Sequence, residues 1–309
     1  MNRTVIFMGT PQIAVPSLQA LLDAGFNIPL IVSQPDKPKG RGNRLQPTPV
    51  KELAMVHNIS VFQPETLRNN PVAVETLTSL KPDFFAVVAY GKILPVDILD
   101  IPAIAPVNVH FSLLPLYRGA APVNWAIMNG DTKTGVSTMK MDAGMDTGDI
   151  LLTEETLVAF KNAEELAGEL SHTGAELLVK TLRGYESIVP KKQDTSSATA
   201  APMMKKEDGL INWGKTAGEI ERMIRAFVPW PAAYTYLEGK MLKISASAVD
   251  SEYVENNPGM IYRTNKKNFS VGTGAGGLIV NKLQPEGKRS MTAAEFLAGY
   301  KLKEGTSLG

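Results

Sequence analysis

The sequence predicts a two-domain α/β protein in which a domain with a mostly parallel, Rossmann-like sheet is followed by a small β-barrel domain. The chain has 309 residues, more than one hydrophobic core usually holds. Its first 185 residues alternate short β-rich runs with helical patterns, which is typical of a doubly wound sheet. The rest of the chain becomes short alternating runs separated by Gly, Asn and Lys, which is typical of a barrel of hairpins.

The first domain opens with a strand and a turn. Strands are expected at Thr4 to Met8, Ile28 to Ser33, Phe84 to Ala89 and Val107 to Phe111, and helices at Ile13 to Ala24 and Asn162 to Gly184. The turn Gly9-Thr10-Pro11 lacks the Gly-x-Gly-x-x-Gly spacing of dinucleotide-binding proteins, so NAD and FAD are not expected. Ligands of open α/β sheets bind beyond the carboxyl ends of the strands. Functional residues are therefore expected in the loops that follow strands.

A polar segment separates the two domains. Pro190 to Pro202 contains mostly Lys, Gln, Ser, Thr and Ala and offers nothing to bury, so it is interpreted as a linker. The expected divisions are residues 1–189, a linker at 190–207, and 208–309. The last part begins with helical spacing at Ile220, Met223, Ile224 and Phe227, and its strands are expected at Tyr234 to Leu237, Leu242 to Ala248, Gly259 to Tyr262, Phe269 to Gly272 and Gly277 to Leu283.

Composition excludes several classes of protein. A hydrophobic share of 44% and a charged share of 20% are typical of a globular chain, and no run of eighteen apolar residues predicts a membrane span. The first residues do not resemble a signal peptide, and the absence of cysteine excludes thiol nucleophiles and disulfides, so a cytoplasmic location is expected. Because the net charge is only +1, binding of nucleic acid would need a local basic patch.

The strongest chemical signal lies where a strand ends in the sequence Asn108-Val109-His110-Phe111-Ser112-Leu113-Leu114-Pro115. Alternation along the strand places Asn108 and His110 on one face and the two apolar residues between and after them on the other. The other histidines of the chain, His57 and His172, fall in helical patterns among polar residues, where surface positions are expected. His110 is therefore the candidate for chemistry, against the alternative of a structural histidine at a strand end.

A second signal is the glycine-punctuated acidic turn from Met141 to Ile150. Its aspartates at 142, 146 and 149 do not have the spacing of an EF-hand and no closing glutamate follows, so no metal site is expected. A plain turn with solvated carboxylates is the alternative. The residues alone do not bring Asp146 close to His110.

These motifs together resemble the signature of enzymes that use 10-formyltetrahydrofolate. The resemblance rests on Asn-x-His-x-Ser-Leu-Leu-Pro, followed about thirty residues later by Asp-x-Gly-x-Ile with Asp146 at its head. It implies that Asn108, His110 and Asp146 form a catalytic trio. It also implies a folate-contacting loop and, more weakly, a backbone segment that lines the pterin site; these contacts are Ser112, Leu113, Leu114 and Pro115 in the loop and Ile93 and Leu94 in the segment.

The chemistry of formyl transfer agrees with these residue types. Transfer from a nitrogen to an amine passes through a tetrahedral species with a negatively charged oxygen, which needs hydrogen-bond donors. Asn108 and a protonated His110 supply such donors. A carboxylate at Asp146 favours the charged imidazole and accepts a proton from the attacking amine, directly or through a water.

The acceptor of the formyl group is indicated by the loop from Gln34 to Lys51. This loop is rich in Gly and Pro and carries five positive charges against one negative charge. A solvated flexible loop is one interpretation. The other is a basic arm that contacts phosphates, formed by Lys37, Lys39, Arg41 and Arg44, with Arg41 between glycines that permit close approach of the backbone.

The loop closely resembles the insertion that methionyl-tRNA formyltransferases place against the acceptor stem. Ile211-Asn212-Trp213 and the run from Ile224 to Pro231 resemble that family's entry into a C-terminal barrel, which is similar to an OB-fold and also contacts tRNA. The resemblance implies 10-formyltetrahydrofolate as donor, methionyl initiator tRNA as acceptor, and neither a membrane nor an obligate protein partner.

Two alternatives stay open at this point. A sugar-nucleotide formyltransferase would share the trio and a Trp-Pro-containing C-terminal region, but the basic loop is not expected there. A non-enzymatic RNA-binding protein built on the barrel would not need the complete trio. A glycinamide ribonucleotide formyltransferase would normally end after the first domain, so the additional barrel argues against it.

Overall fold

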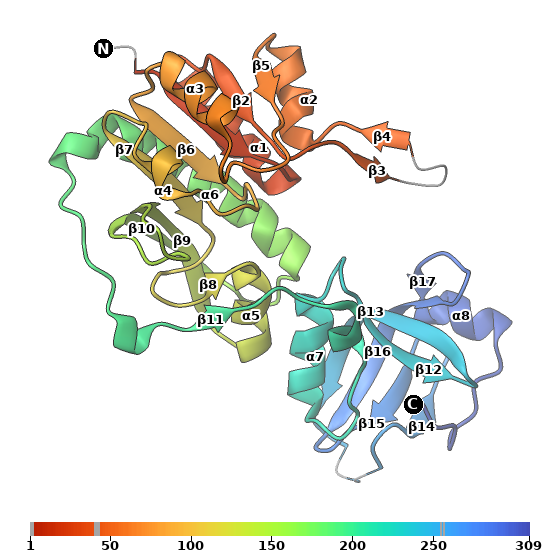
Figure 1. Ribbon diagram of the computed structural model, residues 1–309. Coiled ribbons are helices and arrows are strands. Elements are labelled where there is room, and N and C mark those ends of the chain that lie inside the picture. The colour runs from red at the N-terminus through yellow and green to blue at the C-terminus, as the bar shows by residue number, and fades with distance from the viewer. Residues whose placement is uncertain (1–2, 40–43, 254, 256) are drawn as a thin grey trace. The chain divides into compact units, whose positions relative to one another are not determined.

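A seven-stranded sheet organises the first part of the computed structural model, which describes residues 3–39, 44–253, 255 and 257–309 (Figure 1). The strand order is β10-β9-β7-β6-β1-β2-β5. The five strands from β5 to β7 in this order run parallel, whereas β9 and β10 are antiparallel to their neighbours. The bounds are β1 Val5–Gly9, β2 Leu30–Val32, β5 Ser60–Phe62, β6 Phe84–Val88, β7 Ala105–His110, β9 Lys133–Lys140 and β10 Ile150–Leu157. The predicted mostly parallel, Rossmann-like sheet is thus confirmed.

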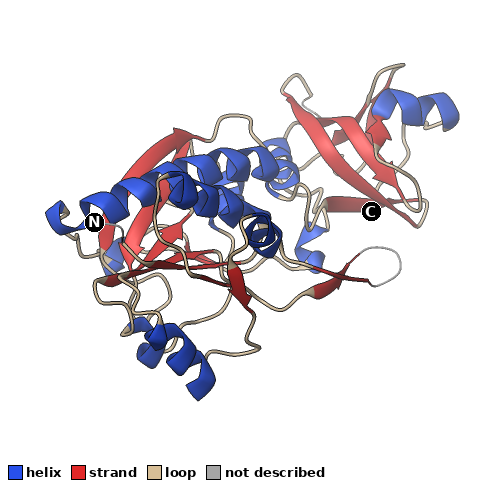
Figure 2. Ribbon diagram, turned by 90° about the horizontal axis from the view of Figure 1, so that it is seen from above, coloured by secondary structure: helices blue, strands red, loops and turns tan. Residues whose placement is uncertain are grey.

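Helices lie on both faces of this sheet (Figure 2). On one face, Ile6 and Met8 of β1 belong to a buried cluster with Leu77 of α3 and Ile98 of α4. On the other face, a Cβ added to Gly174 of α6 would lie 2.9 Å from Val109 of β7, so this helix packs closely against the strand. The helical bounds are η1 Gln12–Ala14, α1 Val15–Asp23, α2 Pro49–Val56, α3 Pro71–Ser79, α4 Val96–Leu99, α6 Ala163–Gly184 and η2 Tyr185–Ser187. Because both faces are covered, β1, β2 and β6 are apolar throughout, whereas β7 contains Asn108 and His110 near its carboxyl end.

The chain reverses direction across the sheet at β1. It runs outward from β1 through β2 to β5 and then returns to β6, on the other side of β1. The carboxyl ends of β1 and β6 are joined there, since the Thr10 hydroxyl donates to the Tyr90 carbonyl over 3.1 Å. His110 ends the neighbouring strand β7 at the same edge of the sheet. This edge is where ligands bind in open α/β sheets.

The segment expected to be an unburied linker is partly built into the structure. It contains η3 Thr195–Ser197 and β11 Ala200–Ala201, and β11 pairs in parallel with β8 Arg118–Gly119. Ala201 is fully buried. The expectation that this stretch has nothing to bury is therefore wrong, because its pairing partner lies some eighty residues earlier and local composition does not reveal it.

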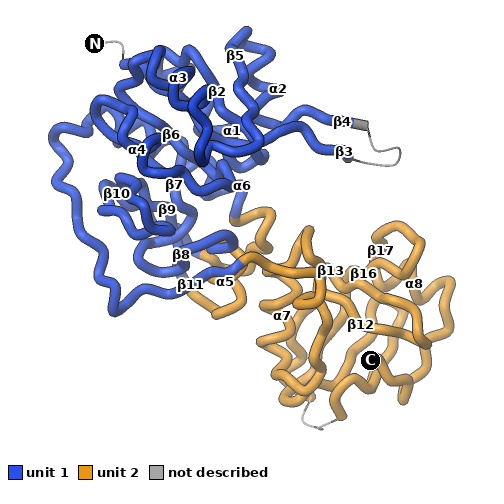
Figure 3. The backbone as a smooth tube through the Cα atoms, in the orientation of Figure 1, with its two compact units in different colours: residues 1–122, 133–157, 167–202 blue, residues 123–132, 158–166, 203–309 orange. Residues whose placement is uncertain are grey.

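Two units are distinguished in Figure 3. The N-terminal unit contains residues 1–122, 133–157 and 167–202, and the C-terminal unit contains residues 123–132, 158–166 and 203–309. Two segments that precede residue 167 thus join the C-terminal unit. Most of α5 Pro122–Asn129 belongs to it, and the Asn124 side chain donates to the Ala226 carbonyl over 2.7 Å. The boundaries expected from local composition place both segments in the first domain.

The C-terminal unit is built on an antiparallel sheet with the order β12-β13-β16-β15-β14, and β17 pairs with β16. Isolated bridges join Leu237 to Leu308 and Met260 to Ser307, so the last residues of the chain connect the two edges. This closure agrees with the predicted OB-like barrel. The bounds are η4 Lys206–Gly209, α7 Ala217–Ala226, β12 Ala233–Leu237, β13 Lys240–Asp250, β14 Ile261–Thr264, β15 Phe269–Gly272, β16 Gly277–Pro285, β17 Met291–Thr292 and α8 Ala293–Gly299.

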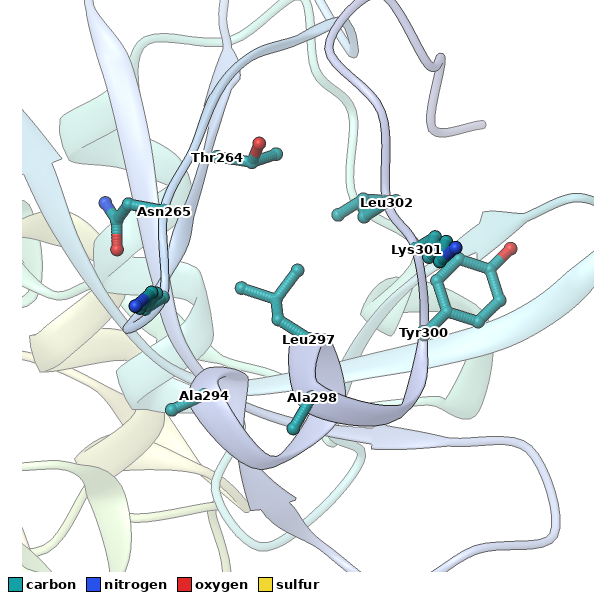
Figure 4. Close-up of a pocket in the computed structure, with 9 residues that line it drawn as sticks. Thr264, Asn265, Ala294, Leu297, Ala298, Tyr300, Lys301 and Leu302 are labelled. Atoms are coloured by element: carbon teal, nitrogen blue, oxygen red, sulfur yellow. The ribbon is translucent and has the colours of Figure 1, made fainter.

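The C-terminal unit also contains a hollow of about 470 Å³ (Figure 4). Leu297 of α8 projects into it, with Ala294 and Ala298 at its floor and Thr264 and Asn265 along one side. None of its lining residues belongs to the site predicted from the sequence. In the described parts of the chain, no helix is both long enough and apolar enough to span a bilayer.

Candidate active site

Asn108 and His110 project from the same face of β7. Their exposed fractions are 8% and 6%, and Val109, between them, packs on the opposite face against α6. Because successive side chains of a strand alternate between faces, the polar pair faces away from that helix. The sequence-based prediction that these two residues share a face is consistent with this arrangement.

The orientation of the His110 ring is fixed by a backbone carbonyl. Its Nε2 lies 2.8 Å from the Tyr117 carbonyl oxygen. A carbonyl only accepts, so Nε2 carries a hydrogen and donates it. In the neutral ring, Nδ1 is then an unprotonated acceptor, and it donates only when the ring carries both protons.

The structure brings Asp146 to the remaining nitrogen of that ring. Its Oδ1 lies 3.7 Å from His110 Nδ1, and its side chain is 17% exposed. Its Oδ2 accepts a hydrogen bond of 2.8 Å from the Gly119 backbone N–H. The separation from His110 is too long for a direct hydrogen bond but suits an ion pair with the protonated ring. A group that bridges the two would exchange protons with either side chain.

The backbone conformation of Asp146 is part of this arrangement. Its φ is +54°, in the left-handed region that aspartate adopts more readily than most residues. Gly148 follows two residues later, and a Cβ there would lie 1.8 Å from the Lys140 carbonyl oxygen. Glycine is therefore required at 148 for the turn to pass this close to β9.

The Asn108 amide is available to a ligand. Within the part of the chain that the structure describes, no hydrogen bond involves its side-chain oxygen or nitrogen. The amide atoms are not among the fully buried polar atoms that lack a partner, so they reach solvent, where water or a ligand can satisfy them. The amide is therefore a suitable donor for an oxygen that becomes negatively charged beside His110.

The loop predicted to contact folate is itself strongly braced. The Ser112 hydroxyl donates to the Leu116 carbonyl over 2.5 Å, and Ser137 Oγ donates to the Ser112 carbonyl over 2.7 Å. Leu114 is buried against Met139 and Ile150. The side chains of Ser112 and Leu114 therefore hold the loop in shape. Those of Leu113 and Pro115 are half-buried and remain accessible to a ligand.

The second predicted folate contact, Ile93 and Leu94, also contains one accessible and one buried side chain. Leu94 is 3% exposed and belongs to the core beneath the sheet, whereas Ile93 is 74% exposed. Gly91, just before them, has a φ of +80°, and a Cβ there would lie 2.4 Å from the side-chain nitrogen of Gln34. The segment thus presents Ile93 and its backbone, while Leu94 anchors it.

The basic loop forms a two-stranded hairpin, β3 Lys37–Lys39 with β4 Arg44–Gln46. Lys37 pairs with Gln46, and Lys39 pairs with Arg44 nearest the turn. The Lys37 side chain is exposed. Arg41 lies outside the described residues. Of the predicted cations, Lys37, Lys39 and Arg44 thus lie in paired strands, which the composition of the loop did not indicate.

An ion pair anchors the base of this hairpin. Asp36 accepts from Lys51 Nζ over 2.6 Å and from Gln63 Nε2 over 2.7 Å. The hydrogen bond from Lys51 is the main cause that lowers the pKa of Asp36 from its ordinary value of 3.8. Gln63 also donates to the Gln34 carbonyl over 2.8 Å. Lys51 therefore neutralises Asp36, and the four other basic residues of the loop carry its net positive charge.

Three residues around the trio were not assigned a role from the sequence. They are Tyr117, whose carbonyl holds His110; Gly119, whose N–H holds Asp146; and Gln193, which donates to the carbonyls of Asp146 and Gly148. The first two act through backbone groups, and a backbone contact is not recorded in the sequence. No group of three or more His, Asp or Glu placed to hold a metal occurs among the described residues.

Comparison with known proteins assigns the chain to a class. The sequence model of the formyl transferase family matches residues 1–182, and that of the formyl transferase C-terminal domain matches residues 203–301. The chain is thus a member of the formyl transferases. It is 46% identical to a methionyl-tRNA formyltransferase of Geobacter sulfurreducens, over 99% of this chain and 96% of that protein. It is 48% identical to one of Trichlorobacter lovleyi, over 98% and 96%. Within the class, it belongs to the methionyl-tRNA formyltransferase family.

Solved structures agree on the fold. An N-formyltransferase from Helicobacter canadensis, in complex with folinic acid and dTDP-3-aminofucose, covers 92% of this chain and 100% of its own length with a TM-score of 0.69. Its sequence identity is 23%. A methionyl-tRNA formyltransferase from Clostridium thermocellum covers 80% of this chain and 93% of its own length with a TM-score of 0.52 and 18% identity. Both similarities describe the fold alone.

Proposed function

We propose that this enzyme transfers the formyl group of 10-formyltetrahydrofolate to the amino group of methionyl initiator tRNA, with Asn108, His110 and Asp146 as catalytic residues. One observation carries the assignment of the residues. At the carboxyl end of β7, the His110 ring lies 3.7 Å from the Asp146 carboxylate, beside the amide of Asn108. The membership of the methionyl-tRNA formyltransferase family supports the reaction and the acceptor.

The donor supplies a formyl group that is already activated by its attachment to a ring-substituted nitrogen. The residues present fit such a molecule, since the exposed Ile93 and the half-buried Leu113 and Pro115 offer apolar contacts to a planar ring. The Asn108 amide and the doubly protonated His110 then donate hydrogen bonds to the formyl oxygen as it gains negative charge. Donors preorganised in this way are typically worth about 10²- to 10³-fold in rate.

Asp146 handles the proton of the attacking amine. Its Oδ1 faces His110, and its Oδ2 is held by the Gly119 N–H, so the carboxylate has a fixed orientation. The amine bonds to the formyl carbon and gives its surplus proton to this carboxylate, directly or through a water. The bond between the formyl carbon and the donor nitrogen then breaks, and that nitrogen takes up the proton held by Asp146, directly or through a water, which restores the carboxylate. The imidazolium keeps its Nε2 hydrogen bond to Tyr117 throughout.

The hairpin β3–β4 supplies the affinity for tRNA in this proposal. Lys37, Lys39, Arg41 and Arg44 would replace counterions on backbone phosphates, which makes binding dependent on salt concentration. The ion pair between Asp36 and Lys51 holds the base of the hairpin that carries these cations. We place the reaction in the cytoplasm, where charged tRNA enters translation, and the proposal requires no further protein subunit.

The proposal is tested by offering the purified protein 10-formyltetrahydrofolate with either methionyl initiator tRNA or an amino-sugar nucleotide. We expect formylmethionyl-tRNA and no formylated sugar, and the His110→Ala variant serves as the control for non-enzymatic transfer. Formylation of the sugar alone would contradict the acceptor and leave the catalytic trio standing. Formylation of neither acceptor would contradict the reaction itself.

A further inference from the structure

Gln193 occupies the centre of a hydrogen-bond network between the supposed linker and the turn that carries Asp146. Its Nε2 donates to the Asp146 carbonyl over 2.8 Å and to the Gly148 carbonyl over 2.7 Å. Its Oε1 accepts from Arg118 Nε over 3.0 Å and from Arg118 Nη2 over 2.7 Å. A glutamine amide has two donor hydrogens and an oxygen with two lone pairs. The full hydrogen-bonding capacity of this side chain is therefore used.

The contacts of Gln193 require an amide. The two carbonyls on one side need a donor, and the guanidinium on the other side needs an acceptor. Glutamate lacks the donor and lysine lacks the acceptor, so neither replaces it. Asparagine is one methylene shorter. Gln193 thus links a donor to two acceptors: its oxygen accepts from the Arg118 guanidinium, and its nitrogen donates to the carbonyls of Asp146 and Gly148.

The chain on either side of Gln193 is held by backbone pairing. Lys191 and Ile150 exchange two backbone hydrogen bonds of 2.8 Å. Further along, the Thr199 hydroxyl accepts from the Tyr117 N–H over 2.8 Å, and the Thr199 carbonyl accepts from the Arg118 N–H over 2.8 Å. The segment therefore contacts the loop that orients His110 as well as the turn that carries Asp146. Gln193 therefore lies between Lys191 and Thr199, two residues of the same segment that are held by hydrogen bonds to other parts of the fold.

From this geometry we propose that Gln193 is a positioning residue for Asp146, a role that rests on the proposed function. Its amide fixes the carbonyls at 146 and 148, and so holds Asp146 at its positive φ with the carboxylate directed at His110. Gln193 contacts neither substrate in this account. Replacing Gln193 leaves Asn108, His110 and Asp146 in place in the sequence but changes the position of the Asp146 carboxylate.

The test is a double-mutant cycle between Gln193→Glu and Asp146→Asn. Glutamate keeps an acceptor for Arg118, but places an oxygen where the two carbonyls need a donor. We expect Gln193→Glu alone to lower kcat about 30-fold, with the KM values for both substrates within about threefold of wild type. In the Asp146→Asn background, measured by single turnover, the same change should lower the rate less than about threefold.

The neighbouring residue offers a matched control. Asp194 is exposed, and its carboxylate accepts from the backbone N–H and the hydroxyl of Ser196. Asp194→Asn changes the charge of the same segment by one unit in the opposite direction, at a carboxylate whose hydrogen bonds are local to its own turn, and we expect kcat within about twofold of wild type.

Two results would overturn the proposal. One is a kcat of Gln193→Glu within about twofold of wild type. The other is an equal loss of rate in both backgrounds, which is the result of a general structural role. If Gln193→Glu does not fold, Gln193→Met has a similar volume, lacks both polar functions and enters the same cycle. A wild-type protein that leaves methionyl-tRNA unmodified contradicts the proposed function instead, and this is seen before any variant is compared.

Discussion

The end of β7 and the β3–β4 hairpin carry the two halves of the proposed function, and they are built in opposite ways. At β7, Asn108 and His110 are almost buried, and backbone groups of Tyr117 and Gly119 fix His110 and Asp146. In the hairpin, Lys37 is exposed and the structure describes one anchoring network, at the base of the loop. The first region has one defined geometry, and the second presents charge to the solvent.

The difference corresponds to what each task requires. Proton transfer and stabilisation of an oxyanion depend on the distances between the reacting groups, so small displacements of these groups lower the rate strongly. Attraction of phosphates depends on the number and sign of nearby charges, and tolerates movement. We therefore expect substitutions at β7 to change kcat and substitutions in the hairpin to change KM for tRNA.

The largest effect is expected from His110→Ala and Asp146→Asn. Each should lower kcat by at least about 100-fold, because in the proposed mechanism each removes a group that acts in the transition state. Steady-state formylation of methionyl-tRNA measures this, with circular dichroism to confirm that the variants are folded. Near-normal turnover in either folded variant would mean that chemistry does not occur at the end of β7.

A smaller loss is expected from Gly119→Ala, which contains no catalytic group. Gly119 has a φ of +124°, and a Cβ there would lie 2.7 Å from the Ala201 carbonyl oxygen. Alanine should strain the backbone by about 1–3 kcal/mol and displace the N–H that holds Asp146, so we expect kcat to fall about tenfold. Gly168→Ala is the control, because a Cβ added there in helix α6 meets nothing within 4 Å beyond its chain neighbours and the backbone of its own helix. Equal kcat for the two variants would show that Gly119 does not orient Asp146.

The hairpin should respond through affinity. Arg41→Ala and Lys37→Ala are each expected to raise KM for methionyl-tRNA several-fold, to about tenfold, with little change in KM for the folate. Each should also reduce the slope of affinity against salt concentration by about one. Binding titrations at several salt concentrations measure this. An equal rise in KM for the folate would show that the hairpin does not act on tRNA binding alone.

The smallest effect concerns stability at the base of the hairpin. Because Lys51 lowers the pKa of Asp36 below 3.8, its contribution to stability is fully present above that value, and is lost as the pH falls through the lowered pKa. Wild type should therefore be slightly more stable than Asp36→Asn near neutral pH, and the difference should vanish in acid. Urea unfolding at a series of pH values checks this; a difference that grows as the pH falls below 3.8 would contradict the sign.

Sequence periodicity predicted many of the elements and part of the site, although β5, α2, α3, α4 and α8 were not among the expected elements. The alternation of strands and helices predicted the parallel sheet, and period-two alternation placed Asn108 and His110 on one face, because both signals are local. The proximity of Asp146 to His110 came from a family resemblance, since no local pattern records which loops meet at the edge of a sheet. The structure adds the contact itself.

The segment after α6 shows where local reasoning fails. Its polar composition indicated a free linker, yet Ala201 is buried and Gln193 is hydrogen-bonded to the Asp146 turn. Both contacts involve residues more than forty positions earlier in the chain. Polar side chains that are used for hydrogen bonds within the protein have the same composition as solvated ones, so the sequence does not separate the two cases.

Single-turnover formylation with enzyme in large excess tests the division between the regions most directly. At enzyme concentrations that saturate methionyl-tRNA, the double variant Lys37→Ala/Arg41→Ala should transfer the formyl group at nearly the wild-type rate, because its defect is in binding. Asp146→Asn should remain at least about 100-fold slow at any concentration. A hairpin variant that stays slow at saturation, or recovery of Asp146→Asn at high enzyme concentration, would contradict the account.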